Sequence, residues 1–314
     1  LDSLLEQDYP NFEIIALDDA STDKTWEIIQ NYAENNEYVK AIKGEPLPEG
    51  WIGKNWACRQ LAWYAAGEIM IYTDADVWHD SSAVSKTIGL MEKHDLDFLS
   101  AFSQQKTVTF FEKLIIPVID LIIYSFLILW STKLLKSKMF AAANGQWLAI
   151  RKSVYDDIDG HESVKDKIVE DVELSRLAKA KGYHILTTAG TGIVYCRMYN
   201  SLREIWEGLT KNLFGISANS VIVLMIFLSM IAISAIAPFI LLFTKAFFII
   251  AIISIALNIL WRSLLAARFG HPFLIGILLH PVSALFLIAI GLNSAIKSKF
   301  GKVSWKGREF RLNG

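Results

Sequence analysis

The chain has 314 residues and a formal net charge of −1, and 53% of its residues are hydrophobic. Its mean hydropathy of +0.34 is too high for an ordinary soluble domain, so we expect a membrane part. The balanced charge provides no global positive field for nucleic acid, and the two distant cysteines, Cys58 and Cys196, match no metal or disulfide pattern.

Strands and helices are predicted to alternate along the first 214 residues. The chain opens inside a predicted helix at residues 1–10. A strand at 11–19 precedes a helix at 21–35, for which Ser21 or Thr22 is the expected N-cap. Further elements are a helix at 55–67, a strand at 68–76, a helix at 82–95 and a strand at 97–106. This rhythm predicts an α/β domain with a mostly parallel sheet and right-handed crossovers.

The rest of the chain is predicted to be a membrane region at 215–296 followed by a basic tail at 297–314. No charged residue occurs from 216 to 244, which is long enough to cross a bilayer. A second apolar run follows Lys245, and a third carries His280 and Pro281 near its middle. The tail has six basic residues against Glu309 alone.

Charge placement predicts the topology. The basic tail and the loop with Arg262 and Arg268 are both typical of the cytoplasmic side. If residues 1–214 are cytoplasmic too, the chain must cross an even number of times. We therefore favour two spans, 221–243 and 246–264, with a re-entrant or broken third run around Pro281; three full spans with an external tail are the alternative. The expected location is the cell membrane, as a multi-pass protein.

An earlier apolar stretch at 114–130 is ambiguous. Pro117 and Asp120 argue against a clean span, and Lys133, Lys136 and Lys138 follow it. The pattern fits either an interfacial helix that lies on the membrane or a buried core helix.

Two pairs of carboxylates follow predicted strands. Asp74 and Asp76 end one strand, and they point to the same side if the backbone stays extended. Asp18 and Asp19 end another strand, and ligands of open parallel sheets bind at the carboxyl ends of strands. Asp-x-Asp also arises by chance in surface turns, but a second acidic pair at an equivalent edge favours a site. Two hard oxygen donors suit Mg²⁺ or Mn²⁺ carrying a diphosphate.

Three segments resemble the signatures of family 2 glycosyltransferases. Residues 17–25, LDDASTDKT, resemble the Asp-Asp-Gly-Ser-Thr-Asp signature with Ala20 in place of glycine. Residues 73–76, TDAD, resemble the Asp-x-Asp motif, and residues 169–183 resemble the Glu-Asp-x-x-Leu…Gly-Tyr segment. Among membrane members, WIGKNWAC and REIWEGLTKN are most similar to hopanoid- and carotenoid-associated glycosyltransferases, and ceramide glucosyltransferases are more distant.

The resemblance implies a glycosyltransferase A-type fold and a role for each acidic group. It implies that Asp18 and Asp19 reach the base and ribose of a nucleotide, and that Lys54 lies near the nucleotide or diphosphate. Asp74 contributes to the nucleotide site, and Asp76 is the direct ligand of a divalent metal, Mg²⁺ or Mn²⁺. In this family a preceding segment holds a membrane anchor and a first strand, so we expect the chain to be N-terminally truncated.

The same resemblance implies the acceptor side of the site. Asp171 is the expected general base, with Glu170 beside it. Trp206 and Lys211 are expected to cover the diphosphate and the acceptor. The family's Gln-x-x-Arg-Trp motif is incomplete because Ile205 precedes Trp206, which disfavours a processive polymer synthase.

The sequence therefore predicts an inverting glycosyltransferase that moves a sugar from a nucleotide sugar, a UDP-sugar by resemblance, to a membrane lipid. Two alternatives stay open. One is a polysaccharide synthase, and the other is a non-catalytic nucleotide-sugar-binding scaffold in the membrane.

Overall fold

A computed structural model describes residues 1–217, 220–299, 303–305 and 308–310. The chain forms two compact units. Unit 1 comprises residues 1–104 and 128–196, and unit 2 comprises residues 105–127 and 197–314. The two units are described separately below.

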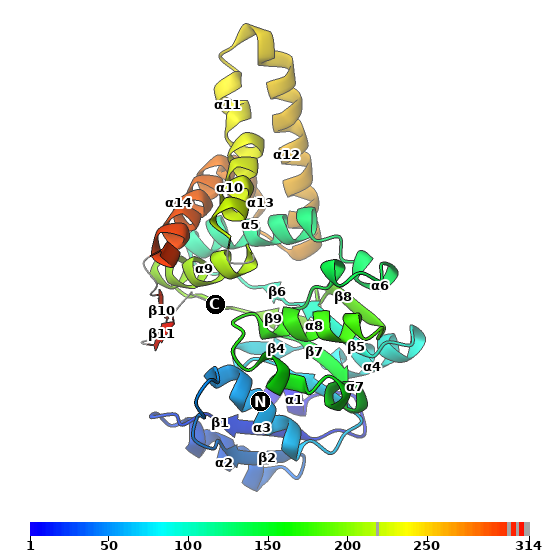
Figure 1. Ribbon diagram of the computed structural model, residues 1–314. Coiled ribbons are helices and arrows are strands. Elements are labelled where there is room, and N and C mark those ends of the chain that lie inside the picture. Colours follow the sequence, from blue (N-terminus) through cyan, green and yellow to red (C-terminus); the bar gives the residue numbers. More distant parts are fainter. Residues whose placement is uncertain (218–219, 300–302, 306–307, 311–314) are drawn as a thin grey trace. The chain divides into compact units, whose positions relative to one another are not determined.

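Unit 1 begins with a parallel pair of strands. Strand β1 (Ile14–Asp18) pairs with β2 (Val39–Lys43), and α2 (Thr25–Asn35) connects them and packs against both (Figure 1). The helix starts later than predicted, because Oδ1 of Asp23 accepts hydrogen bonds from the backbone N–H and the hydroxyl of Thr25. Ser21 and Thr22 therefore do not cap the helix, and the N-cap residue is Lys24.

Four strands form the main sheet of unit 1 in the order β3-β7-β5-β8. Their bounds are β3 (Ile69–Tyr72), β5 (Phe98–Phe102), β7 (Leu148–Arg151) and β8 (Ile185–Ala189). Strands β5 and β8 are parallel, whereas β7 runs antiparallel to both of its neighbours. The predicted α/β class is confirmed, but the sheet is mixed rather than mostly parallel. The reason is that β7 follows a long excursion of the chain instead of a single crossover helix.

Helices and a short strand pair complete unit 1. Strands β4 (Val77–His79) and β9 (Val194–Cys196) pair antiparallel. The α-helices are α1 (Asp2–Leu5), α3 (Gly53–Tyr64), α4 (Ala83–Lys93), α6 (Ser131–Leu134), α7 (Lys152–Asp157) and α8 (Glu170–Ala180).

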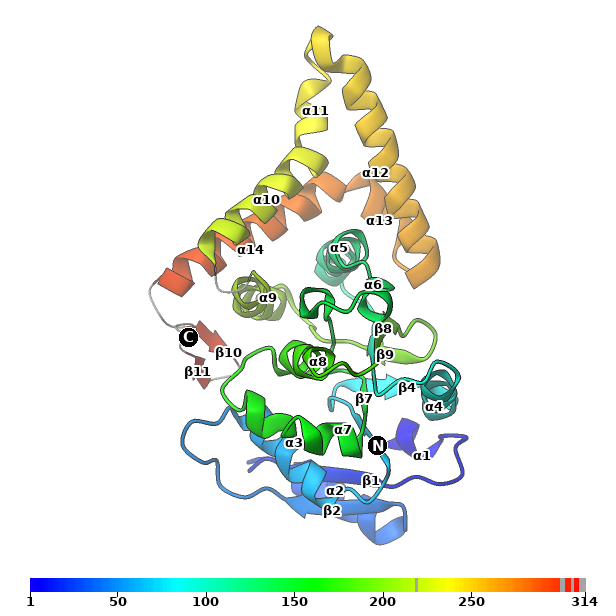
Figure 2. The ribbon, with the colours of Figure 1, turned by 45° about the vertical axis from the view of Figure 1, so that its right-hand side comes forward.

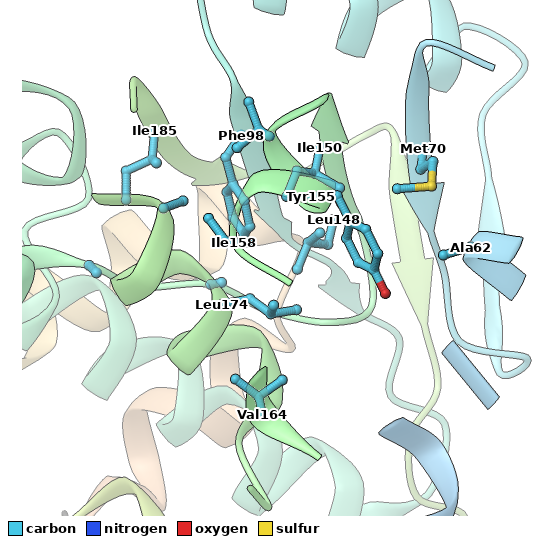
Figure 3. Close-up of a cluster of buried hydrophobic side chains, with 14 residues drawn as sticks. Ala62, Met70, Phe98, Leu148, Ile150, Tyr155, Ile158, Val164, Leu174 and Ile185 are labelled. Atoms are coloured by element: carbon cyan, nitrogen blue, oxygen red, sulfur yellow. The ribbon is translucent and has the colours of Figure 1, made fainter. Parts of the chain in front are cut away.

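The main sheet is buried on both faces. Along β7, Leu148 and Ile150 join one apolar cluster with Phe98 and Tyr155 (Figure 3). Ala149, which points the other way, joins a second cluster under α4. Side chains alternate between the faces of a strand, so a near-continuous apolar strand such as β7 fits the centre of a sheet that is covered on both sides.

Unit 2 is mainly helical. Its α-helices are α5 (Phe110–Phe126), α9 (Leu202–Ile216), α10 (Val221–Ala235), α11 (Ala237–Leu241), α12 (Phe248–Phe269), α13 (Phe273–Leu278) and α14 (His280–Lys299). Helices α10 and α11 run beside α12, and α14 packs on α9 and α10 (Figures 1 and 2). Within the described residues, three helical stretches are long and apolar enough to cross a membrane: Phe110–Leu134, whose last residues belong to unit 1, Lys245–Phe269 and His280–Lys297.

The stretch at 221–243, predicted as one membrane span, is not one continuous helix. Helix α10 ends at Ala235, and α11 contains Pro238 in its first turn. Pro238 has no N–H to offer the carbonyl of Ser234, and the Asn258 side chain of α12 donates to that carbonyl at 2.9 Å instead. Most of the predicted span at 246–264 lies in α12, which continues to Phe269. The third run breaks at Leu279, between α13 and α14, which agrees with the broken element expected around Pro281.

The ambiguous stretch at 114–130 is partly a core helix. A capping box between Thr109 and Glu112 starts α5. Leu114 and Ile115 are almost fully buried, and α5 packs against α13 and α14 of its own unit. Farther along, Phe126 and Trp130 are exposed. The first half of the stretch therefore contributes to the core of unit 2.

Candidate active site

Unit 1 contains a cavity of about 770 Å³ that lies between β1, β3 and α3. Its lining includes the polar side chains of Lys54, Asp74, Glu170 and Asp171. Apolar residues of β1 and β3 and further polar side chains, among them Glu13 and Arg151, line other parts of it. A concave site with a few convergent polar groups on apolar walls is typical of a small-molecule binding site.

Lys54 joins two parts of the chain at this cavity. It is the second residue of α3, and its Nζ lies 2.8 Å from Oε1 of Glu170 and 3.1 Å from Oδ1 of Asp74. Glu170 is the first residue of α8, and Asp74 follows β3. The ammonium group of Lys54 therefore forms ion pairs with both the Asp-x-Asp turn and the Glu-Asp pair. These two motifs are about a hundred residues apart in the sequence.

Asp171 is held by two backbone groups. The N–H of Gly145 donates to its Oδ2 at 2.6 Å, and the N–H of Val172 donates to its Oδ1 at 2.8 Å. An acidic residue in the first turn of a helix also interacts favourably with the helix dipole. The carboxylate is thus fixed in place while it faces the cavity.

The charges of this cluster shift one another's pKa values. Burial, followed by repulsion from Glu170, raises the pKa of Asp171 to about 7, although Lys54 and the two N–H groups oppose the change. Burial lowers the pKa of Lys54, but the carboxylates of Glu170 and Asp74 outweigh it and raise that pKa well above its usual value. Asp171 can therefore take up a proton near neutral pH while Lys54 stays charged.

Gly145 allows this cluster to assemble. A Cβ atom at this position would lie 3.0 Å from Lys54 Nζ and 3.5 Å from Asp171 Oδ2. The direct contact of Gly145 with Asp171 was not predicted. No local pattern shows it, because the two residues are 26 positions apart in the sequence.

The turn after β3 does not have the geometry predicted for it. The strand ends at Tyr72, and the N–H of Val77 donates to the carbonyl of Asp74, which closes a turn. The backbone therefore does not stay extended, and the condition under which Asp74 and Asp76 would point to the same side is not met. Asp74 contacts Lys54, and Asp76 is exposed and hydrogen-bonded with Cys196. Among the described residues, no group of three or more His, Cys, Asp or Glu side chains is arranged to hold a metal.

The first acidic pair lies at the end of β1. Asp18 is buried, and its Oδ1 accepts a hydrogen bond from the N–H of Ser21. Asp19 follows it, and neither residue belongs to the cavity lining that the described part of the chain defines. Ala20 has a φ of +54°, the left-handed region in which glycine is the usual residue. Their nucleotide-binding role stays a prediction.

Neutral groups form another part of the cavity wall. Burial raises the pKa of the Cys58 thiol to about 12, and burial, aided by Lys54 and Arg59, lowers the pKa of His161 to about 3. His161 Nδ1 lies 2.9 Å from the Tyr155 hydroxyl. Cys58 and His161 both line the cavity, and both remain uncharged near neutral pH.

Trp206 and Lys211 lie on α9, in unit 2. Their expected contacts with the diphosphate and the acceptor therefore stay predictions. Arg203 of the same helix is highly exposed and pairs with Glu207 at 2.8 Å.

The N-terminal part of the chain matches a known family. The sequence profile described as "Glycosyl transferase family 2" matches residues 1–142. This part of the chain is similar to family 2 glycosyltransferases. The motif at 73–76 lies inside the matched residues, whereas Glu170 and Asp171 lie beyond them.

Two relatives extend this finding. The chain is 28% identical over 211 residues to the 4,4'-diaponeurosporenoate glycosyltransferase of Staphylococcus haemolyticus, an alignment that covers 67% of this chain and 55% of the relative. It is 31% identical over 104 residues to the UDP-Glc:alpha-D-GlcNAc-diphosphoundecaprenol beta-1,3-glucosyltransferase WfaP of Escherichia coli, which covers 31% of this chain and 37% of the relative. The chain thus spans about half, or less, of the length of these relatives.

A solved structure shares the fold. The mannosyltransferase PcManGT from Pyrobaculum calidifontis, described in complex with GDP-Man and Mn²⁺, aligns with a TM-score of 0.55 at 17% identity. The alignment covers 94% of this chain and 81% of the mannosyltransferase. The predicted glycosyltransferase A-type fold is confirmed.

Proposed function

We propose that this chain is an inverting glycosyltransferase that moves a sugar from a nucleotide sugar, a UDP-sugar, to a membrane lipid. The observation that supports it most directly is the cluster of Lys54, Asp74, Glu170 and Asp171 on the wall of one cavity. The cluster combines a carboxylate with a pKa near 7 and a permanently charged amine, within a chain whose N-terminal part is similar to family 2 glycosyltransferases.

Asp171 is the proposed general base. Its pKa of about 7 lets it accept the proton of an acceptor hydroxyl near neutral pH, and its two backbone hydrogen bonds hold it in position. The deprotonated oxygen attacks the anomeric carbon as the bond to the diphosphate breaks. A single displacement of this kind inverts the anomeric configuration. Lys54 supplies a fixed positive charge that attracts the leaving diphosphate, and Asp18 and Asp19 bind the base and ribose.

A divalent ion, Mg²⁺ or Mn²⁺, is part of the proposal. Asp76 and Asp74 would hold it, with Asp76 as the direct ligand. One or two protein carboxylates, completed by substrate phosphates, are a common ligand set for Mg²⁺, and exposed Asp76 with half-buried Asp74 fits that set. When bound, the metal would neutralise charge on the leaving diphosphate.

The lipid acceptor is supported by unit 2 and by the relatives. Three stretches of the described chain are long and apolar enough to span a bilayer, and the names of both relatives specify lipid-like molecules. We propose a multi-pass protein of the cell membrane with a cytoplasmic catalytic domain. Trp206 and Lys211 are proposed to contact the diphosphate and the acceptor.

Sugar transfer by the purified chain tests this function. The protein, solubilised in detergent, is incubated with UDP-glucose, Mn²⁺ and a bacterial lipid extract, and the released UDP is measured. Asp171→Asn should abolish lipid-dependent UDP release, whereas Asp166→Asn, which changes an exposed acid outside the cavity, should not. Full activity of Asp171→Asn would reject the assignment. If UDP-sugars bind but UDP is never released, the chain is a non-catalytic scaffold.

A further inference from the structure

Unit 2 contains ionisable side chains buried among its apolar helices. Arg262 of α12 and His280, the first residue of α14, are 3% and 4% exposed. Asp120 of α5 and His271 are buried beside them. We call these four residues the Arg262 cluster. Ionisable groups within apolar helices are costly to bury and usually mark a functional site.

Hydrogen bonds account for only part of this cluster. Oδ2 of Asp120 pairs with Nε2 of His271 at 2.8 Å. Arg262 donates from Nε to the carbonyl of Gly276 at 3.0 Å and from Nη1 to the carbonyl of Pro117 at 2.9 Å. In the part of the chain that the structure describes, Nη2 of Arg262 and both ring nitrogens of His280 have no hydrogen-bond partner.

The unpartnered atoms belong to one neighbourhood. The charge of Arg262 acts directly on His280. The guanidinium of Arg262 packs directly against Gly276, where a Cβ atom would lie 2.9 Å from Nη2. Unpartnered nitrogens of Arg262 and His280 are thus buried close enough for their charges to interact, beside Gly276 of α13.

Charge balance indicates the chemistry of that ligand. Carbonyl oxygens satisfy two nitrogens of Arg262 but do not neutralise its charge. Asp120 attracts Arg262 electrostatically, but its hydrogen bond goes to His271. A buried guanidinium that lacks a directly bound anion carries a large desolvation cost, and an oxyanion would remove that cost through charge-assisted hydrogen bonds.

We propose that Arg262 and His280 bind the oxyanion, phosphate or carboxylate, of an amphipathic lipid. Nη2 of Arg262 and one N–H of His280 donate to two oxygens of the headgroup. The apolar chain of the lipid lies along the outer side of α13, where Leu274 and Leu278 are 70% and 72% exposed. This site goes beyond the proposed transfer reaction, because it binds lipid in the absence of a nucleotide sugar.

Calorimetric titration of the full chain in a neutral maltoside detergent tests the proposal. The probes are dodecyl phosphate, dodecanol with the same chain but no charge, and inorganic phosphate. Dodecyl phosphate should bind at least tenfold more tightly than either of the others. Equal binding of dodecanol would overturn the oxyanion site, and equal binding of inorganic phosphate would show a free phosphate site in place of a lipid site.

Substitutions in the Arg262 cluster test whether dodecyl phosphate binds there. Arg262→Gln and His280→Phe should each weaken the binding of dodecyl phosphate at least tenfold, whereas Arg268→Gln, an exposed arginine of the same helix, should not change it. If Arg262→Gln does not fold, Gly276→Ala tests the site instead. This variant keeps both Arg262 and His280 and places a methyl group against Nη2 of Arg262, so it should weaken the binding of dodecyl phosphate. Unchanged binding in Gly276→Ala would overturn the proposal. Asp171→Asn should bind dodecyl phosphate normally, so failure of this site and failure of the proposed reaction are distinguishable.

Discussion

Nζ of Lys54 lies 2.8 Å from Oε1 of Glu170, a side chain that is only 7% exposed. The same nitrogen contacts Asp74 at 3.1 Å. A buried carboxylate needs a charge partner, so Lys54 stabilises the fold of the cavity wall as well as supplying charge to the site.

Lys54→Met should therefore cost stability as well as activity. Loss of the ammonium leaves Glu170 buried without its ionic partner, a change that typically costs about 1–3 kcal/mol. The measurement is the unfolding midpoint of the purified protein, compared with that of Lys167→Met, which removes an exposed ion pair worth roughly 0–1 kcal/mol. A midpoint as high as that of the Lys167 variant would show that Glu170 does not depend on Lys54.

Asp171 predicts two pH dependences. Transfer needs its deprotonated form, so activity should rise with pH through about 7. The folded-state pKa is raised above the ordinary value of 3.8, so protonation favours the folded state. That stabilising contribution is complete below pH 3.8 and is lost as the pH rises to about 7. The unfolding midpoint of the wild type should therefore fall relative to that of Asp171→Asn across this window. Parallel curves for the two proteins would contradict the raised pKa.

Gly145→Ala should reduce activity at least tenfold with the fold intact. The new methyl group would press against Lys54 and crowd Asp171, and a small misplacement of catalytic groups can cost about a hundredfold in rate. Gly89→Ala is the matched control, because a Cβ atom there meets nothing within 4 Å. That control lies inside α4 and should instead gain about 1 kcal/mol. Steady-state rates and circular dichroism of both variants provide the comparison.

Ala20→Gly should stabilise the protein by about 1 kcal/mol. Ala20 adopts φ +54°, a conformation that costs a non-glycine residue roughly 1–2 kcal/mol. The gain is reduced because glycine also increases the entropy of the unfolded chain. Ala33→Gly, inside α2, should lose about 1 kcal/mol. Melting curves of the two variants should thus shift in opposite directions, and a shared direction would show that Ala20 is not strained.

Local sequence patterns predicted the strands that end at Asp18 and Tyr72 and the helix at 55–67, because each depends on short-range periodicity and turn residues. That helix begins earlier than predicted, at Gly53, and therefore includes Lys54. Family motifs then selected Asp74, Glu170 and Asp171, which the structure places around one cavity. The approach of Lys54 to Glu170 was not predictable in this way, since it joins residues more than a hundred positions apart.

The errors have equally local causes. The β-strand at 148–151 was not predicted, and its antiparallel pairing with β3 and β5 joins residues far apart in the sequence. The break in the helix within 221–243 is different, because Pro238 was visible in the sequence. High hydropathy was given more weight than the missing N–H of proline. Residue propensities and hydrophobic patterns thus predict single helices and strands. Which strands pair with each other is set by tertiary packing, which local patterns do not show.

The hydrogen bond from Asn258 to the carbonyl of Ser234 predicts a measurable coupling with Pro238. Asn258→Leu should destabilise the protein by about 1 kcal/mol, because that carbonyl then has no donor. Pro238→Ala restores a backbone N–H four residues after Ser234, so α10 can continue and satisfy the same carbonyl. In the Pro238→Ala background, Asn258→Leu should therefore cost much less. A double-mutant cycle of unfolding midpoints in detergent measures this difference, with Ser263→Ala on α12 as the control for loss of a local hydrogen bond. Additive effects would mean that Asn258 stabilises α12 through its second bond, to the carbonyl of Ser254, and not through the break that Pro238 creates.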